Sequence, residues 1–258
     1  MNSQKYYDKI KVNPEKENSF RILTRFKQTF PHIIKKGTLL DVGCGGGYWL
    51  NFLDKRTQLC LSGADVSPNR IKSALNNIDK EKIDLITADI QNLPFKDNYF
   101  NQTTALEVLE HIPDWEKGLS ELIRVSSSRV VITVPYNQKI IKAKCSHCSE
   151  EAYLYGHIHR FTEYSFKKTN WVNITNIKFK KLPAAFKVED YVYRLLTGIK
   201  KRTKKRIKKN NENGHTQTTI CSKCYNEVSY HKDIEIRLDR AKKIIMHQPE
   251  YLLVQIEK

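Results

Sequence analysis

The sequence predicts an α/β fold in which an open sheet binds a ligand at the ends of its strands. Residues Leu39 to Val42 form a short apolar run that stops at a cluster of glycines, as a buried strand does when it enters a tight turn. A second apolar run, from Leu59 to Ala64, stops at Asp65, and Ser67 and Pro68 then supply the start signals of a helix. Successive strand, turn and helix units of this kind favour a sheet with its binding site at the carboxyl ends of the strands.

The glycines after the first strand predict a loop that approaches a nucleotide. The segment from Asp41 to Gly47 reads D-x-G-x-G-x-G, and residues Tyr48 to Arg56 follow it with apolar residues on one side of a helix. Glycine permits backbone angles and a close ligand approach that a Cβ would forbid, and the N–H groups at the start of the helix would face the loop. The dinucleotide fingerprint G-x-G-x-x-G has a third glycine where this chain has Tyr48, which disfavours a reductase that uses a nicotinamide nucleotide.

Length and charge limit the classes of function. The chain has 258 residues, 40% of them hydrophobic, which is enough for one cored domain with an insertion. Lysine and arginine number 45 against 28 acidic residues, and the formal charge of +17 favours an anionic partner such as nucleic acid, a phospholipid surface or a phosphorylated substrate. Neither a signal peptide nor a long apolar run is present, so we expect a cytoplasmic protein with reduced thiols.

The order of these motifs resembles that of the class I S-adenosylmethionine-dependent methyltransferases, and in particular the type 11 and ubiquinone-biosynthesis methyltransferases. The D-x-G-x-G-x-G segment is similar to motif I of that family, and Asp65 stands where the family's acid binds the ribose hydroxyls. Asp89, within ITADI, resembles the acidic loop that flanks the adenine. Residues Ala105 to Val125 are similar to strand 4 and its helix, and Arg129 to Asn137 to strand 5. The resemblance covers Leu39 to Asn137.

The resemblance implies a seven-stranded Rossmann-like sheet flanked by helices, with S-adenosyl-L-methionine as the cofactor. We expect the later strands over Ile83–Ala88, Phe100–Leu106, Val130–Val134, Ile174–Leu182 and the antiparallel C-terminal run YLLVQIE. The cofactor-binding positions that the resemblance carries over are Asp41, Gly43, Gly45, Gly47, Asp65, Val66, Asp89, Ile90 and Leu106.

The segment before the glycine loop predicts a helix. Apolar residues from Phe20 to Phe30 recur at three- and four-residue spacing, and the helix should end near Pro31. In the resembling family such a helix often lies over the cofactor or acceptor site, whereas the pattern alone fits a helix packed on the sheet. Tyr6, Tyr7 and Tyr48 are candidates for the acceptor pocket, although aromatic residues of this kind also occur in cores.

Titratable residues gather directly after strand 4. Glu107, Glu110 and His111 form an E-x-x-E-H segment that resembles one in the ubiquinone-biosynthesis O-methyltransferases, where the acids and the histidine lie near the acceptor and can hold a divalent cation. The alternative is that Glu110 and His111 only cap the following helix. If the acceptor is a hydroxyl, a general base contributes about 10² to 10⁴ to the rate. The candidates for this base are His111 and, on the insertion after strand 5, His157 or His159.

Two C-x-x-C pairs, Cys145 with Cys148 and Cys221 with Cys224, predict one structural Zn²⁺. Four thiolates complete the closed tetrahedral shell of structural zinc. The first pair follows strand 5 and the second precedes the final strand, so we expect the two to leave the sheet near one another. Disulfides are disfavoured in a reducing compartment. Free thiols, or a shell in which a histidine replaces one cysteine, are the alternatives.

A strongly basic run stands between the C-x-x-C pairs. Lys200 to Lys209 holds eight basic residues in ten and follows the apolar segment Tyr191 to Ile199. Such a pairing can lie on an anionic membrane surface, which would suit a lipid-linked acceptor and a peripheral location at the inner membrane surface. Nucleic acid is another anionic partner, and a solvated linker is the plain alternative. A charged helix with apolar residues from Ile234 to Ile244 should follow the second pair.

The predicted organisation has three regions: an N-terminal helical segment over 1–36, a cofactor-binding core over 37–137, and a region over 138–258 with the zinc-binding insertion, the basic linker and the closing strands. We expect a methyltransferase that acts on a small-molecule, sugar or lipid-linked acceptor. A methyltransferase of RNA or DNA is the alternative, disfavoured because Glu107 to Glu110 stand where base N-methyltransferases carry an Asn-Pro-Pro-Tyr type signature. Protein methylation and a non-catalytic cofactor-binding module are further alternatives.

Overall fold

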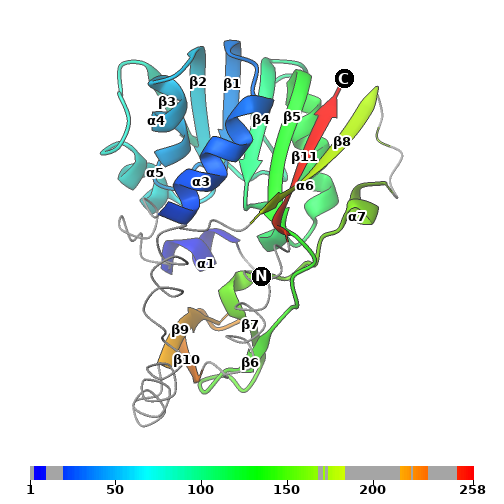
Figure 1. Ribbon diagram of the computed structural model, residues 1–258. Helices are drawn as coiled ribbons and strands as arrows, with labels where there is room; N and C mark the ends of the chain where they lie inside the picture. The colour runs from blue at the N-terminus through cyan, green and yellow to red at the C-terminus, as the bar shows by residue number, and fades with distance from the viewer. Residues whose placement is uncertain are drawn as a thin grey trace, which may run out of the picture.

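The computed structural model describes residues 3–9, 20–167, 171, 174–183, 216–221, 223–231 and 249–258. Its main feature is a seven-stranded sheet with the strand order β3-β2-β1-β4-β5-β11-β8 (Figure 1). The strands are β1 (Lys36–Val42), β2 (Gln58–Asp65), β3 (Ile83–Thr87), β4 (Phe100–Leu106), β5 (Ser126–Pro135), β8 (Asn176–Pro183) and β11 (Pro249–Glu257). Strands β1 to β5 are parallel to one another, and β11 is antiparallel to β5 and to β8. The predicted seven-stranded Rossmann-like sheet is confirmed.

The strand limits agree with the sequence pattern to within two residues, except at β1, which begins at Lys36 and not at Leu39, and at β5. This strand begins at Ser126, four residues before the expected Val130, because Ser126 already pairs with Phe100 of β4. Its last seven residues, Arg129 to Pro135, pair with β11. The strand is therefore paired on both sides from Arg129 to Thr133, and all residues from Val130 to Pro135 are buried.

Helices cover both faces of the sheet. On one face lie α3 (Phe20–Thr29), α4 (Tyr48–Asp54) and α5 (Pro68–Ala74), and on the other lie α6 (Trp115–Val125) and α7 (Glu163–Lys167). The first face is packed by aromatic rings, with Phe26 at 5.0 Å from Trp49 between ring centroids and Trp49 stacked on Phe52 at 5.4 Å. On the other face, Phe161 and Phe166 stack at 5.4 Å. Apolar burial on two faces of one sheet fixes the register of its strands.

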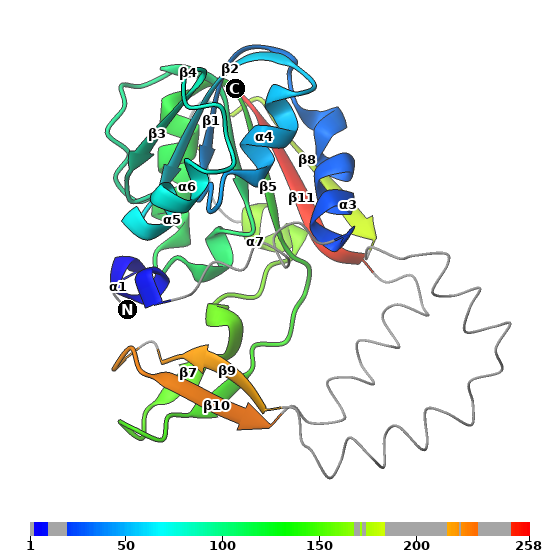
Figure 2. The same ribbon diagram turned by 90° about the vertical axis from the view of Figure 1, so that its left-hand side faces the viewer.

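The position of the N-terminal helix decides between a helix packed on the sheet and one that lies over the cofactor or acceptor site. Helix α3 packs on the sheet, with Phe26 in the core and Arg21 and Arg25 over the ring of Tyr251 in β11. A separate short helix, α1 (Ser3–Lys9), lies below the carboxyl edge of the parallel strands (Figures 1 and 2). The helix over the sheet is therefore the structural one, and a helix that the sequence pattern did not predict lies beside the strand ends.

Below α1 lie two antiparallel hairpins, β6 (Lys142–Lys144) with β7 (Glu151–Tyr153) and β9 (Thr216–Ile220) with β10 (Glu227–His231) (Figure 2). They come from segments on either side of β8, and both lie at the same end of the molecule. We refer to the two hairpins as the hairpin pair.

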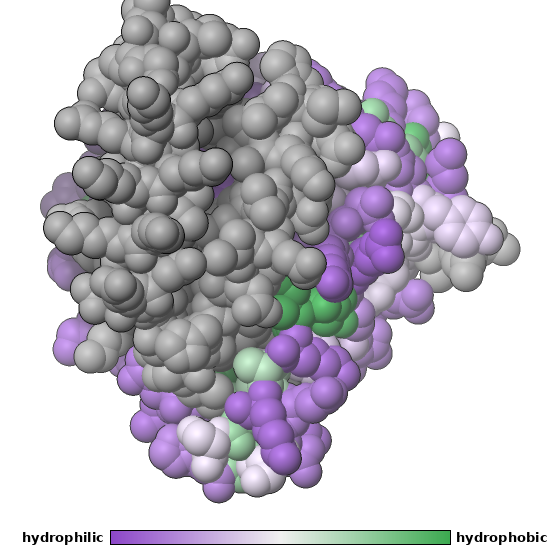
Figure 3. All heavy atoms as spheres, turned by 60° about the horizontal axis from the view of Figure 1, so that its bottom comes forward, coloured by the Kyte–Doolittle hydropathy of each residue, from purple (hydrophilic) through white to green (hydrophobic). Residues whose placement is uncertain are grey.

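Several expectations fall on residues that are not described. The apolar segment Tyr191 to Ile199, the basic run Lys200 to Lys209 and the charged helix from Ile234 to Ile244 all lie outside the described residues. Within the described ranges, no helix has the length and apolar character that crossing a bilayer requires. Viewed from the lower end of Figure 1, the visible described surface is mainly hydrophilic, with a small hydrophobic area (Figure 3).

Candidate functional site

The loop that follows β1 is held against β2 by its own backbone. The N–H groups of Gly43 and Cys44 both donate to the carbonyl oxygen of Ala64, at 2.7 and 3.0 Å. Gly47 has a φ of 76° and is the N-cap of α4, and a Cβ at this position would lie 2.8 Å from the Cγ2 of Ile78. Both the backbone angle and the packing of the loop therefore require glycine here.

Asp65 connects the end of β2 to this loop. Its Oδ2 accepts a hydrogen bond from the N–H of Gly45 at 3.0 Å, and its Oδ1 accepts one from the N–H of Ser67 at 2.9 Å. Burial raises the pKa of Asp65, and the N–H of Ser67, the Arg70 guanidinium and the N–H of Gly45 oppose that rise. The carboxylate thus lies beside the glycine loop at the carboxyl edge of the sheet, where open α/β sheets bind ligands.

Asp41 has a different position from Asp65. It is 3% exposed, and its Oδ1 accepts a hydrogen bond from the Oγ1 of Thr104 at 2.6 Å. Burial raises the pKa of Asp41 to about 7, against the hydrogen bond from Thr104. Asp41 therefore joins β1 to β4 beneath the loop.

The remaining expected cofactor positions lie at or near the same edge. Asp89 follows β3 and is half-buried, and its Oδ1 accepts a hydrogen bond from the N–H of Gln91 at 2.9 Å. Val66 and Leu106 are half-buried at the ends of β2 and β4. The side chain of Ile90 is 4% exposed and packs in the core.

Helix α1 bridges this edge and the residues after β4. Asp8 accepts a hydrogen bond from the Oγ of Ser67 at 2.5 Å. The guanidinium of Arg70 lies 5.4 Å from the ring centroid of Tyr7, and the Tyr7 ring meets the His111 ring edge-on at 5.7 Å. Tyr7 was a sequence candidate for the acceptor pocket, but no sequence pattern had indicated Asp8 or Arg70 because an isolated charge on a short helix carries no spacing signal.

Three titratable residues come together on the side of α1 that Tyr7 faces. Ligand atoms of Glu110, His111 and His157 all lie within 4.8 Å of one another. The Nε2 of His111 is 3.8 Å from the Oε1 of Glu110, and the His111 and His157 rings are 4.8 Å apart between centroids. We refer to these three residues as the Glu–His cluster. The structure thus brings together the two histidines that the sequence proposed for catalysis, although 45 residues separate them in the chain.

Both histidines of the Glu–His cluster are anchored through Nδ1. The Nδ1 of His111 lies 3.1 Å from the carbonyl oxygen of Gly156, and that of His157 lies 2.8 Å from the Oε1 of Gln138. Since both partners are oxygen acceptors, Nδ1 carries the proton on each ring and Nε2 carries the lone pair. Burial lowers the pKa of His111 to about 3 and that of His157 to about 4, so both rings are neutral at pH 7.

The helix-capping alternative for Glu110 and His111 is wrong. The N-cap of α6 is Asp114, whose Oδ1 accepts a hydrogen bond from the N–H of Lys117 at 3.0 Å. Glu110 is 1% exposed, and neither of its carboxylate oxygens has a hydrogen-bond partner among the described residues. Burial raises its pKa well above the ordinary value, and the nearby Glu107 raises it further.

Glu107 and His159 lie outside the Glu–His cluster. The Oε2 of Glu107 is 3.6 Å from the Nη1 of Arg25 on α3, a half-buried ion pair that the sequence did not indicate. The Nε2 of His159 is 2.8 Å from the carbonyl oxygen of Ile112 and therefore donates to it. His159 is thus anchored by the backbone as His111 is, but its ring does not join Glu110 and His157.

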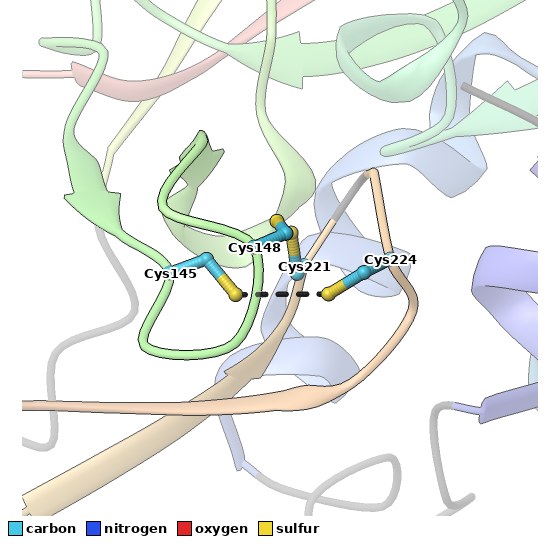
Figure 4. A group of neighbouring side chains, drawn as sticks. All are labelled: Cys145, Cys148, Cys221 and Cys224. Atoms are coloured by element: carbon cyan, nitrogen blue, oxygen red, sulfur yellow. Dashed lines mark hydrogen bonds between the residues drawn. The ribbon is translucent and has the colours of Figure 1, made fainter.

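The four cysteines of the C-x-x-C pairs lie together between the two hairpins (Figure 4). The Sγ atoms of Cys145 and Cys224 are 3.6 Å apart, and those of Cys148 and Cys221 are 3.7 Å apart. A disulfide would require about 2.05 Å, whereas two sulfurs at about 2.3 Å from one tetrahedral Zn²⁺ lie roughly 3.8 Å apart. The geometry fits the shell of one zinc ion and not a pair of disulfides.

The turns that carry the cysteines repeat one another. In the first, the N–H of His147 approaches the Sγ of Cys145 at 3.4 Å, and in the second the N–H of Lys223 approaches the Sγ of Cys221 at the same distance. In both turns the residue after the second cysteine has a positive φ, 61° at Ser149 and 58° at Tyr225. Equivalent N–H groups thus point at equivalent sulfurs, an arrangement that stabilises thiolates.

Comparison with known proteins identifies the core of the chain. Residues 40–132 match the model of a family described as "Methyltransferase domain". These residues form a methyltransferase domain. The matched segment runs from the middle of β1 to the middle of β5 and contains the glycine loop, Asp65 and the E-x-x-E-H segment.

Two curated relatives that this chain matches are also named as methyltransferases. Norajmaline N-methyltransferase of Rauvolfia serpentina is 33% identical over 105 residues, covering 39% of this chain and 36% of that protein. Demethylmenaquinone methyltransferase of Desulfitobacterium hafniense (strain Y51) is 36% identical over 94 residues, covering 34% of this chain and 37% of that protein. The chain thus matches little more than a third of the length of either relative.

A solved structure extends the likeness of fold beyond the matched segment. Phosphoethanolamine N-methyltransferase 2 of Haemonchus contortus, solved in complex with S-adenosyl-L-methionine, superposes with a TM-score of 0.55 at 16% identity. The superposition covers 92% of this chain and 52% of that one. The methyltransferase domain of this chain therefore belongs to a fold that extends into β8 and β11.

Proposed function

We propose that this chain transfers a methyl group from S-adenosyl-L-methionine to a small-molecule acceptor, including sugar or lipid-linked acceptors. The observation that carries the proposal is the contact between Asp65 and the N–H of Gly45, which places a carboxylate beside a glycine turn inside the methyltransferase domain. Two relatives are named as methyltransferases, one for norajmaline and one for demethylmenaquinone, which favours a small organic acceptor over a nucleic acid.

The residues at the strand ends suit the nucleoside part of the cofactor. Asp65 would accept hydrogen bonds from both ribose hydroxyls, and Asp89, after β3, would lie near the adenine. The turn through Gly43 and Gly45 would follow the methionine part closely. Asp41 acts from beneath the loop by holding β1 to β4 through Thr104, and so it fixes the position of the turn.

Catalysis of methyl transfer depends mainly on aligning the acceptor with the methyl carbon and the sulfur. When bound, the cofactor supplies a methyl carbon on a positively charged sulfur, and the acceptor displaces that sulfur in line. Holding the acceptor and the methyl carbon in this geometry contributes up to roughly 7 to 11 kcal/mol of rate enhancement. Tyr7, which touches Arg70 on one side and His111 on the other, would hold the acceptor between the cofactor edge and the Glu–His cluster. With no metal ion in the Glu–His cluster, the neutral rings of His111 and His157 would each offer a lone pair toward an acceptor proton.

The four cysteines would hold one structural Zn²⁺. The support is the sulfur spacing, the repeated turns and the position of Cys145 and Cys221, both of which are buried. A shell of four thiolates has no open position, so the ion would stabilise the hairpin pair and would not activate a ligand. Ile158 of the segment after β7 donates its N–H to the carbonyl oxygen of Glu110 at 2.9 Å, which links the hairpin pair to the Glu–His cluster.

The test of the function is a search for the acceptor. The purified chain is incubated with S-adenosyl-L-methionine labelled in its methyl group and with fractions of a cell extract, separated into small molecules, lipids, RNA and protein. We expect label in the small-molecule or lipid fraction, and none with Asp65→Ala. Label confined to RNA would show that the acceptor is a nucleic acid and not a small molecule. No transfer to any fraction would count against the methyltransferase activity itself.

A further inference from the structure

We propose that Glu110, His111 and His157 bind one divalent transition-metal ion, separate from the ion of the cysteine cluster. The three residues come from two segments, the turn after β4 and the segment after β7, and meet below the sheet edge. The resemblance noted from the sequence would have used Glu107 together with Glu110 and His111. In the structure Glu107 pairs with Arg25, and His157 stands in the cluster in its place.

The first argument is the state of Glu110. Its carboxylate is buried, and both oxygens lack a hydrogen-bond partner within the described part of the chain. A buried carboxylate without a partner is expensive, on the order of several kcal/mol if it is ionised. A cation at the cluster would supply the missing partner.

The second argument is the direction of the two imidazoles. Metal-binding histidines donate one ring N–H to an oxygen acceptor, which fixes the tautomer and the orientation of the ring. His111 and His157 both do so, toward the carbonyl oxygen of Gly156 and the side-chain oxygen of Gln138. The Nε2 of His111 lies 3.8 Å from the Oε1 of Glu110, beyond a hydrogen bond but within the roughly 4.2 Å that two ligands at about 2.1 Å from one ion can span.

The ligand types indicate the class of ion. Ca²⁺ and Mg²⁺ prefer shells made of oxygen, whereas two imidazoles and one carboxylate suit Zn²⁺, Fe²⁺, Co²⁺ or Mn²⁺. Three protein ligands leave positions open, in contrast to the four thiolates of Cys145, Cys148, Cys221 and Cys224. If the proposed methyl transfer is correct, an open position beside Tyr7 would bind an oxygen of the acceptor and lower the pKa of its hydroxyl. The metal site itself does not depend on that function.

The test measures metal binding directly. Zinc-loaded protein, dialysed against a chelator until only the cysteine-bound ion remains, is titrated with Co²⁺ by calorimetry and visible absorption. We expect one Co²⁺ per chain, with no thiolate-to-cobalt charge-transfer band. Glu110→Gln and His157→Gln should each weaken binding at least about 10-fold, since even the loss of an outer-shell partner costs that much. His159→Gln is the matched control and should bind Co²⁺ like the wild type, because His159 lies outside the Glu–His cluster.

The same preparations are titrated with S-adenosyl-L-methionine, which separates the two proposals. Cobalt binding with no cofactor binding would support the metal site and count against the proposed function. Cofactor binding with no second metal ion in the wild type would overturn the metal site. Cobalt binding that both variants retain, or that carries a thiolate band and disappears with Cys148→Ser, would also overturn it.

Discussion

Asp65 makes two contacts in the free chain and is expected to make two more with the cofactor. Its oxygens accept hydrogen bonds from Gly45 and Ser67, so the carboxylate is fixed before a ligand arrives. A hydrogen bond to a charged group contributes about 1.5 to 3 kcal/mol. Asp65→Ala removes both bonds to the ribose hydroxyls and loosens the glycine turn, so we expect the Kd for S-adenosyl-L-methionine to rise at least roughly 100-fold.

Isothermal titration calorimetry checks this expectation. Asp84→Ala is the matched control, because Asp84 is an exposed carboxylate on the neighbouring strand β3. Equal affinity of Asp65→Ala and wild type would show that the ribose is bound elsewhere.

The raised pKa of Asp41 predicts that the stability of the folded chain depends on pH. Its pKa is raised from 3.8 to about 7 in the folded chain because it is buried. Between about pH 4 and 7 the unfolded chain has lost this proton while the folded chain retains it, so stability falls as pH rises through that window. The full effect is on the order of 4 kcal/mol. Above pH 7 both states are ionised and the contribution no longer changes.

The variant Asp41→Asn isolates this effect, since Asn cannot ionise. Urea unfolding at pH 5, 6 and 7 should show the free energy of unfolding of the variant rising relative to wild type as the pH increases. A constant difference between the two proteins would mean that Asp41 ionises normally. The sequence placed Asp41 at the cofactor, but it contains no sign that Thr104, 63 residues away, would enclose the carboxylate.

At the scale of elements, the strands of the sheet were the most predictable part. Strands β1, β2, β5 and β11 contain apolar runs, β8 alternates apolar and polar residues, and β2 ends at Asp65 as expected. Helix α1 could not be predicted, since seven residues are too few to show a helical period and Tyr6 and Tyr7 are held by tertiary contacts. The hairpin strands β6 and β7 have three residues each, which is too short for an alternating pattern to predict a strand.

The hairpin pair is expected to depend on zinc. Four thiolates from two distant turns meet with little other packing, since the buried cluster there contains only Cys145, Ala152 and Cys221 among the described residues. A structural zinc ion contributes folding free energy directly. Protein purified without added metal should contain about one zinc per chain, and Cys148→Ser should lose it.

Elemental analysis and limited proteolysis measure the two consequences. Cys148→Ser should be cut faster near the hairpin pair, whereas Cys60→Ser, which removes an exposed cysteine outside the cluster, should behave like wild type. A zinc-free wild type that resists proteolysis would contradict the structural role.

At the scale of the whole molecule, the sheet places three separate parts of the sequence at one edge. The glycine loop, the E-x-x-E-H segment and the insertion after β5 meet there, and α1 contacts Ser67 after β2 and His111 of the E-x-x-E-H segment. The order of motifs predicted that the glycine loop and the E-x-x-E-H segment would lie together, because parallel strands end at the same edge. It did not predict that His157 would join Glu110, since an insertion has no fixed position relative to the strands.

The positive charge of the chain is only partly accounted for by the described residues. The run Lys200 to Lys209 lies outside them, and its interaction with an anionic membrane or with nucleic acid stays a prediction. Flotation with neutral and anionic vesicles, and RNA binding at increasing salt, would distinguish the two partners from a solvated linker.

The central claim is that the methyltransferase domain binds S-adenosyl-L-methionine at the edge formed by β1 and β2. The most direct test is a calorimetric titration of the wild-type chain with S-adenosyl-L-methionine, with S-adenosylhomocysteine as competitor and NADH as the alternative nucleotide. We predict saturable binding of one cofactor per chain, competition by S-adenosylhomocysteine and no heat from NADH. Binding of NADH, or no binding of S-adenosyl-L-methionine, would contradict the claim.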